Sequence, residues 1–353
     1  MRQKDTYYIR LADSESDNIC GLGEAGLFRG LSCDDRPDYE QKLAEVCENI
    51  DRYAARPSLL ADWPSIRFAV ETAVRDLSNG GRRIICPSPW TAGKETIVIN
   101  GLVWMGDRNL MRERIATKLA ERFGCVKIKI GGINFDDEVG LLRFIRQEAP
   151  GIQLRLDANG AFTPANALDR LNRLAEFDIH SLEQPIKAGQ WTEMRNICQS
   201  SPIPIALDEE LIGITTKARK EMMLDEICPQ FIVLKPTLTG GIESSEEWIR
   251  LAGEHGCGWW VTSALESNIG LNAIAQWTAT LDSKMAQGLG TGQLYDNNIP
   301  SPLTLHGERL SYSPEDEWEI PPLHWHGFSH PKLKPLLTSG PLPSPMPEPR
   351  PPG

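Results

Sequence analysis

The chain has 353 residues, of which 37 are Lys or Arg and 48 are Asp or Glu, so its formal net charge at pH 7 is −11. A charge of this sign argues against a broad contact with nucleic acid or anionic lipid, and an anionic substrate would need a local cationic pocket. Hydrophobic residues make up 41% and charged residues 24%. These values are typical of a globular protein with a sizeable core and exclude a chain that is disordered throughout.

Eight cysteines are scattered along the chain without a C-x-x-C pair or a close Cys/His cluster. We therefore expect reduced core thiols, with disulfides or a reactive nucleophile as the alternatives. The first ten residues are charged and lack an apolar signal segment, and no stretch reaches the roughly 18 apolar residues of a membrane span. The expectation is a soluble cytoplasmic protein.

The first hundred residues predict an α+β unit, with strands first and helices afterwards. A polar turn separates the two strands, and glycines at 21, 23, 26 and 30 indicate that the second strand ends in a mobile loop. The second helix begins at Pro64 and stops at Asn79-Gly80-Gly81. The expected strands are residues 7–13 and 19–32, and the expected helices are residues 38–53 and 64–77.

A different sequence pattern begins near residue 97, where short apolar runs typical of buried parallel strands recur about every 27 residues. Helix-like segments lie between them, for example over residues 108–124, 138–150 and 164–177. Eight such repeats with right-handed crossovers favour a (β/α)₈ barrel over the alternative, an open doubly wound sheet. The runs are centred near residues 99, 128, 155, 182, 206, 233, 261 and 288.

These patterns predict that the chain is divided into three parts. Residues 1–95 form the α+β domain with its mobile loop, and residues 96–330 form the barrel with a C-terminal return segment. Residues 331–353 contain nine prolines. Such a segment cannot build a sheet or a core, so we expect an extended or disordered tail.

Charged residues stand at the ends of the predicted barrel strands, where the active site of such a barrel lies. Lys129, Asp157, Glu183, Asp208 and Lys235 follow one another at intervals of 25 to 28 residues, which matches the strand repeat. Their side chains should therefore converge on one mouth of the barrel.

Three carboxylates from adjacent strands, Asp157, Glu183 and Asp208, would repel one another in a partly buried site unless a cation neutralised them. A divalent ion would do so, and oxygen ligands without His or Cys point to Mg²⁺, with Mn²⁺ as a substitute. The alternative is that each carboxylate caps a helix or pairs with a lysine.

Lys127 and Lys129 are two residues apart on one strand and so point to the same face. With a metal ion and Lys235 nearby, we expect the positive field to lower the pKa of each lysine until it can act as a base. The alternative is a pair of solvated charges. Together with the metal, this arrangement predicts proton abstraction next to a carboxylate, because cations stabilise the enediolate that forms.

The stretches VKIKIGG, LRLDANGAF, SLEQPI, IALDEEL, VLKPTLTGG and TSALESNIGLNAIAQ resemble the successive signatures of the muconate-lactonizing-enzyme subgroup of the enolase superfamily. The resemblance covers about residues 5–305. It implies an α+β capping domain whose loop, Gly21 to Ser32, closes over the substrate, next to a modified (β/α)₈ barrel. The alternative for the loop is an ordinary flexible hairpin end.

The resemblance also implies roles for individual residues. Lys129 would be the acid/base, Lys127 would stabilise the enediolate, and Lys235 would face the substrate ring as a cation. Asp157, Glu183 and Asp208 would bind Mg²⁺, supported by Asn159 and Glu209. Candidate donors to a second substrate carboxylate are Thr239, Thr262 and Ser263.

Within the subgroup, the signatures are most similar to synthases that remove water from a hydroxylated cyclohexadiene carboxylate with a succinyl side chain, a step toward menaquinone. N-succinylamino acid racemases and muconate cycloisomerases share the catalytic frame and stay open. Dipeptide epimerases carry an Asp-x-Asp after strand eight, where this chain has Gly288 to Gly292. From another class, an inactive barrel that acts as a binding protein is the remaining alternative, and the oligomeric state stays open.

Overall fold

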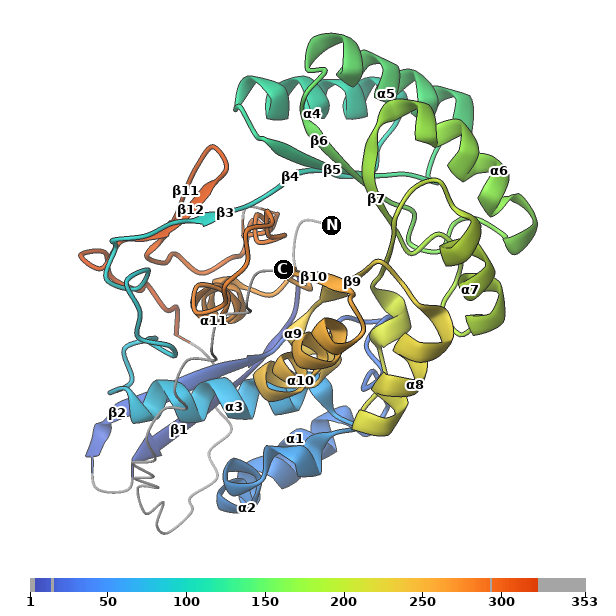
Figure 1. The fold of residues 1–353 in the computed structure, drawn as a ribbon. Helices are drawn as coiled ribbons and strands as arrows, with labels where there is room; N and C mark the ends of the chain where they lie inside the picture. The colour runs from blue at the N-terminus through green and yellow to red at the C-terminus, as the bar shows by residue number, and fades with distance from the viewer. Residues whose placement is uncertain (1–3, 14–15, 293, 323–353) are drawn as a thin grey trace, which may run out of the picture.

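Seven parallel strands form the largest sheet of the computed structural model, which describes residues 4–13, 16–292 and 294–322. Their order, β10-β9-β8-β7-β6-β5-β4, follows the chain without a reversal (Figure 1). A doubly wound sheet reverses its order at a switch point, so the structure favours the curled, barrel-like arrangement. The strands are β4 (Gly101–Val103), β5 (Cys125–Lys129), β6 (Gln153–Asp157), β7 (Ile179–Glu183), β8 (Ile205–Leu207), β9 (Phe231–Leu234) and β10 (Gly258–Val261).

The eighth expected strand, near residue 288, is not a strand. Isolated parallel bridges join Ile99 to Gln287 and Thr262 to Gly288 instead. A Cβ added to Gly288 would lie only 1.5 Å from Thr262 Oγ1, so this close approach requires a glycine. Two residues therefore close the gap between β10 and the first strand of the barrel, where we expected a full strand.

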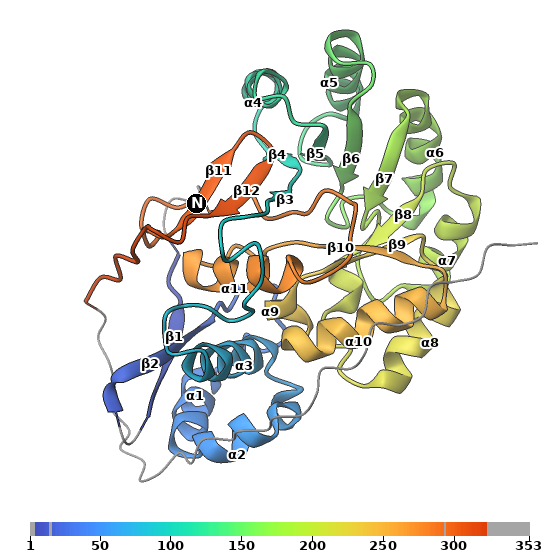
Figure 2. The ribbon, with the colours of Figure 1, turned by 60° about the vertical axis from the view of Figure 1, so that its left-hand side comes forward.

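The first expected barrel strand is divided in two. Its start, β3 (Ile97–Val98), pairs with β12 (Arg309–Tyr312), which also pairs with β11 (Leu303–His306). Its end is β4, which belongs to the parallel sheet. Figure 2 shows the β11–β12 hairpin beside β3, so the C-terminal part of the described chain returns to the start of the barrel.

Helices cover the outside of the curled sheet (Figure 1). Their apolar faces join the strands in one large core cluster; on α5, for example, Leu142 and Ile145 are fully or almost fully buried. The helices are α4 (Arg108–Ala120), α5 (Phe135–Glu148), α6 (Pro164–Leu174), α7 (Trp191–Ser200), α8 (Lys217–Ile227), α9 (Pro236–Thr239), α10 (Gly241–Glu254) and α11 (Asn268–Thr278), with short 3₁₀ turns at Ala175–Phe177 and Glu209–Leu211.

The N-terminal elements are an antiparallel hairpin and helices, as the sequence predicts, but their limits differ. The first expected helix breaks at Asn49, and the second strand ends at Ala25, before most of the expected loop. Gly21 and Gly23 thus lie within that strand. The elements are β1 (Tyr7–Asp13), β2 (Ser16–Ala25), α1 (Tyr39–Glu48), α2 (Ile50–Ala55), the 3₁₀ turn Pro57–Leu60 and α3 (Pro64–Ser78).

The glycines of β2 allow its backbone to approach α3. A Cβ on Gly21 would lie 2.0 Å from Ala73 O, and one on Gly23 would lie 1.9 Å from Ala69 O. Both distances are far below van der Waals contact, so no larger residue fits without moving the helix. These two glycines serve packing and not the loop motion that the sequence suggested.

Two carboxylates of the N-terminal elements cap helices of the barrel. Glu24 on β2 accepts hydrogen bonds from Ser267 N (2.9 Å) and Gly270 N (2.9 Å) at the start of α11. Glu71 on α3 accepts one from Ile242 N (2.6 Å) at the start of α10. A carboxylate at a helix N-terminus satisfies free N–H groups and the helix dipole, so both contacts fasten the two parts together.

Two further expectations concern the whole chain. All eight cysteines are free, in agreement with reduced thiols, but only Cys125, Cys198 and Cys257 are buried, so the expected position in the core is wrong for the other five. Among the residues that the structure describes, no helix is both long and apolar enough to cross a membrane. The expected proline-rich tail, residues 331–353, lies outside the described residues.

The close packing of β2 on α3 gives a test. Gly23→Ala should lower the free energy of unfolding by about 1–3 kcal/mol, because the added methyl group must displace the α3 backbone. Chemical denaturation measures this change. Gly253→Ala in α10 is the matched control, since its new Cβ meets no atom within 4 Å, and it should not destabilise the protein. Equal effects of the two substitutions would contradict the packing argument.

Candidate active site

The register of the parallel strands aligns the charged residues at one end of the barrel. Lys129 on β5 lies opposite Asp157 on β6, which lies opposite Glu183 on β7. Each of these residues ends its strand, and Lys127 stands two positions before Lys129, on the same face. Asp208 and Lys235 directly follow β8 and β9.

Lys127 and Lys129 form a compact group of ion pairs with two carboxylates. The Lys127 Nζ lies 2.7 and 2.6 Å from the two oxygens of Glu183 and 2.8 Å from Asp157 Oδ2. The Lys129 Nζ donates to the same Asp157 oxygen at 2.6 Å. One carboxylate therefore receives two ammonium groups.

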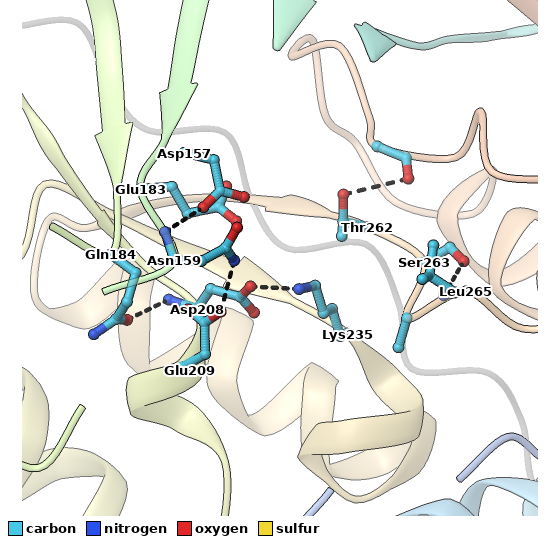
Figure 3. Close-up of polar contacts among 12 residues, drawn as sticks. Asp157, Asn159, Glu183, Gln184, Asp208, Glu209, Lys235, Thr262, Ser263 and Leu265 are labelled. Carbon is cyan, nitrogen blue, oxygen red and sulfur yellow. Dashed lines mark hydrogen bonds and ion pairs between the residues drawn. The ribbon is translucent and has the colours of Figure 1, made fainter. Parts of the chain in front are cut away.

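A second group of polar contacts lies beside Asp157 and Glu183 (Figure 3). The Lys235 Nζ donates to Asp208 Oδ2. Asn159 links the two groups, because its Oδ1 accepts from Lys129 Nζ at 2.7 Å and its Nδ2 donates to Glu209 Oε1 at 2.8 Å. The other carboxylate oxygen of Glu209 is buried without a hydrogen-bond partner in the described part of the chain.

Because the carboxylates are buried, each one strongly affects the pKa of its neighbours. Asp157, Glu183 and Asp208 are at most 2% exposed. Burial and the neighbouring Asp157 raise the pKa of Glu183 well above its usual value, and burial and Asp208 raise the pKa of Glu209. The pKa of Asp157 is well below its usual value despite its burial, because Lys127 and Lys129 favour its charged form.

The prediction that the lysines have lowered pKa values is wrong for Lys127 and Lys235 as they stand here. Burial by itself would lower both values, but Asp157 and Glu183 raise the pKa of Lys127, and Asp208 and Glu209 raise that of Lys235. The expectation assumed that a metal ion had neutralised these carboxylates. Without that charge, the carboxylates stabilise the ammonium groups.

The donors of this site suit a hard divalent cation, although the present side-chain positions are those of ion pairs. Three buried carboxylates offer only oxygen, and burial together with the neighbouring Asp157 raises the pKa of Glu183. In the described residues, no three His, Cys, Asp or Glu side chains converge on one point where a metal could be held. The ammonium groups of Lys127 and Lys235 lie among the carboxylates instead.

A cavity of about 310 Å³ opens directly onto this cluster. Lys127, Lys129 and Lys235 line it together with Asn159 and Glu209. Its walls are otherwise largely apolar, and they come from the turn after β2, from β4 and the loop after it, from α9 and from the loop after β10. The apolar lining residues are Phe28, Leu31, Leu102, Trp104, Met105, Leu238, Ala264 and Leu265.

The three candidate hydroxyl donors lie in different surroundings. Thr262 and Ser263 line the cavity, but Thr239 does not, because its hydroxyl bonds to Lys235 O and Ser245 Oγ. Ser263 donates its hydroxyl proton to Glu266 Oε2 at 2.5 Å. Only Thr262, whose contact with Gly288 O is long at 3.3 Å, has a hydroxyl that is free to turn toward a ligand.

Several residues of the site were missed in the sequence. Gln184 is completely buried, and its Oε1 accepts from the N–H groups of Asp208 and Glu210 at 3.2 Å each. Gln184 belongs to the SLEQPI stretch, but nothing in the sequence indicated its role. Trp104 and Met105 line the cavity, yet nothing in the local sequence distinguishes them from core residues, whereas Phe28 lies in the loop that the resemblance placed over the substrate.

Comparison with known proteins agrees with this fold. Residues 110–314 match the family model described as "Enolase C-terminal domain-like". The o-succinylbenzoate synthase of Desulfotalea psychrophila is 44% identical over 349 residues, which cover 89% of this chain and 93% of that protein. The o-succinylbenzoate synthase of Citrobacter koseri is 26% identical over 82% of this chain and 84% of its own length.

Solved structures show the same relationship. The crystal structure of MenC from Desulfotalea psychrophila superposes with a TM-score of 0.77 at 44% identity and covers 87% of this chain and 94% of its own. The L-Ala-D/L-Glu epimerase from Bacillus subtilis reaches a TM-score of 0.71 over 87% of this chain and 88% of its own. Because its identity is only 19%, that likeness concerns the fold alone.

The fold and the matched model define the protein as an enzyme of the enolase superfamily, whose members generally use Mg²⁺. Within the superfamily, the chain belongs to the o-succinylbenzoate synthase family, and it is a carbon–oxygen lyase.

Gln184 provides a test of how the site is held together. Gln184→Leu should lower the free energy of unfolding by about 2–5 kcal/mol, because it leaves buried N–H groups of Asp208 and Glu210 without partners. Denaturant titration measures this loss. Gln190→Leu is the control, since its side chain makes one exposed bond to Lys187 O, and it should cost under about 1 kcal/mol. A small effect at Gln184 would contradict its positioning role.

Proposed function

We propose that the protein converts 2-succinyl-6-hydroxy-2,4-cyclohexadiene-1-carboxylate into o-succinylbenzoate and water. The observation that carries this proposal is the position of the lysines around one cavity. Lys127 and Lys129 come from β5 and Lys235 comes from β9, with three strands between them. A flat, anionic ring in this cavity would meet an ammonium group on each side.

Lys129 is the proposed base. Its Nζ lies at the cavity wall and is oriented by Asp157 and Asn159. In its neutral form it takes the proton from the ring carbon that bears the carboxylate. The electron pair of the broken C–H bond then moves into the carboxylate, which becomes an enediolate.

The enediolate carries one more negative charge than the substrate, and two cations meet it. Lys127 stands beside Lys129 on the same strand face, and Lys235 faces the cavity from β9. Fixed charges in a site that is closed to water stabilise a developing charge better than solvent does. This stabilisation is required only for the first step, because formation of the aromatic ring drives the second.

The second step breaks a carbon–oxygen bond. The electron pair of the enediolate returns to the ring, and the hydroxyl group leaves from the neighbouring carbon. Lys129, which now carries the abstracted proton, gives it to this oxygen, so that water departs from the same face. The lysine is neutral again, and all atoms of the substrate are found in the aromatic product and in water.

Asp157, Glu183 and Asp208 would hold Mg²⁺, or Mn²⁺ in its place, with Asn159 and Glu209 in support. When bound, the ion supplies a Lewis-acid charge for the carboxylate oxygens of the substrate. The three buried carboxylates, which offer only oxygen, and the unpartnered oxygen of Glu209 both fit a cation at this place.

The apolar walls suit the uncharged parts of the substrate. Phe28 and Leu31 from the turn after β2 and Trp104 and Met105 after β4 would cover the ring and the succinyl methylene groups. The part of the expected loop that faces the cavity is therefore Phe28–Leu31 and not the whole of Gly21 to Ser32. Among the three candidate donors, Thr262 is the one proposed to reach the succinyl carboxylate.

N-succinylamino acid racemisation is the second candidate function. Lys129 and Lys235 line the same cavity from separate strands, and two lysines that face one carbon from both sides could exchange its proton. This reaction needs the same cation and the same base, so the site geometry permits both activities.

Lys129→Ala should abolish exchange of the substrate α-proton with solvent deuterium and reduce turnover at least about 10³-fold, because Lys235 meets the ring from its other side. Mass spectrometry follows the exchange, and ultraviolet absorbance follows the aromatic product. Lys94→Ala, at an exposed position away from the cavity, is the control and should behave like the unaltered protein. Exchange at the normal rate in Lys129→Ala would refute this base.

Removal of divalent ions should stop turnover. After treatment with a chelator, we expect the rate to fall below detection and to return on addition of Mg²⁺ or Mn²⁺, because the carboxylates then regain their counter-charge. Asp157→Asn should not recover under the same conditions. Full activity without a divalent ion would show that the carboxylates do not serve a metal.

One preparation assayed with both substrates separates the candidate functions. We expect turnover of the cyclohexadiene carboxylate with a kcat/KM above about 10⁴ M⁻¹s⁻¹, the range of ordinary enzymes, and a lower value for N-succinyl amino acids. The reverse order would favour the racemase. Turnover of neither substrate, with retained binding of the product, would favour a barrel that only binds ligands.

A further inference from the structure

Lys4, near the start of the chain, connects two loops at the mouth of the cavity. Its Nζ donates to Leu265 O at 2.9 Å and to Gly26 O at 3.3 Å. Gly26 precedes the turn that carries Phe28, and Leu265 lies in the loop after β10. Phe28 and Leu265 both line the cavity, so one ammonium group holds two of its walls together.

Phe28 itself adds a third contact. The Lys4 Nζ lies 5.9 Å from the centroid of the Phe28 ring, within the range of a cation–π interaction. The rest of the turn is held by its own bonds, since Ser32 N donates to Phe28 O at 2.9 Å and Phe28 N donates to Ser32 Oγ at 2.9 Å. Lys4 thus fixes the position of a turn that is already internally formed.

The second loop has a backbone that needs support. Leu265 has a φ of 65°, in the left-handed region that is unfavourable for a non-glycine residue. Leu265 N donates to Ser263 Oγ at 3.0 Å, and Leu265 O receives the Lys4 ammonium group. The backbone of Leu265 is thus hydrogen-bonded at both its N–H and its C=O group, and these bonds keep its side chain at the cavity.

Glu24 explains why a cation stands at this place. Its carboxylate is completely buried, and burial raises its pKa, while Lys4 acts in the opposite direction. Glu24 also accepts from Thr6 Oγ1 at 3.0 Å. The N-terminal segment is therefore anchored by Thr6 and carries its ammonium group from there to the cavity mouth.

We propose that Lys4 is a positioning residue of the active site, which holds the Phe28–Leu31 turn and the Leu265 loop together over the bound substrate. The inference rests on the proposed function, because it assigns the substrate to this cavity. Lys4 does not touch the reacting atoms. It acts by raising the fraction of molecules whose cavity walls are in place, and this fraction scales the apparent affinity for substrate.

Lys4→Met, which keeps the length of the side chain but removes its charge, should raise KM about tenfold and leave kcat within about twofold. A loss of this size matches the removal of one charge-assisted hydrogen bond. Lys4→Arg should recover most of the affinity, since a guanidinium can reach both carbonyl groups. Arg10→Met is the matched control, because it removes the charge of an exposed residue of the same N-terminal hairpin and leaves the Thr6 anchor intact, and its KM should not change.

Hydrogen exchange on the ligand-free protein tests the same proposal without catalysis. Lys4→Met should exchange faster at residues 26–32 and 263–267, while the hairpin β1–β2 keeps its protection. Loss of protection only in residues 4–13, with an unchanged KM, would overturn the proposal and leave Lys4 as a chain anchor. If the unaltered protein turns over no substrate, the proposed function fails, and the exchange result still decides whether Lys4 joins the loops.

Discussion

The balance of charge at the carboxyl ends of β5 to β9 is the constraint on which the rest of the site depends. Three lysines and three carboxylates share a region with almost no access to water, where an unpaired charge costs several kcal/mol. Strand register brings Lys129, Asp157 and Glu183 level with one another. The fold therefore determines where these charged side chains lie. They form ion pairs with one another at a position that a substrate can reach.

The enclosing walls depend on the N-terminal elements. Glu24 and Glu71 cap helices of the barrel, so the β1–β2 hairpin and α3 are fixed beside the cavity. From this support the turn at Phe28 lines the cavity together with the loop that carries Trp104. Apolar side chains and charged groups thus line one cavity, as the proposed substrate requires.

Much of the fold could be predicted because parallel strands repeat at a regular interval and leave charged residues at one end. The same spacing predicted the grouping of Lys127, Lys129, Asp157, Glu183, Asp208 and Lys235, which the structure brings together, although their roles stay proposals. Contacts between distant segments could not be predicted. Gly288 makes one of the two bridges that close the barrel, because Thr262 leaves no space for a side chain, and Thr239 lies away from the cavity, where its hydroxyl bonds to Lys235 O and Ser245 Oγ.

The central claim is that the three carboxylates hold a divalent ion and so free the lysines for the substrate. Anomalous X-ray diffraction from crystals of the protein soaked in Mn²⁺ tests it most directly. We expect one strong anomalous peak within coordination distance of Asp157, Glu183 and Asp208, with the Nζ atoms of Lys127 and Lys235 no longer paired with Glu183 and Asp208. A site without a peak, and with the ion pairs intact at saturating Mn²⁺, would contradict the account.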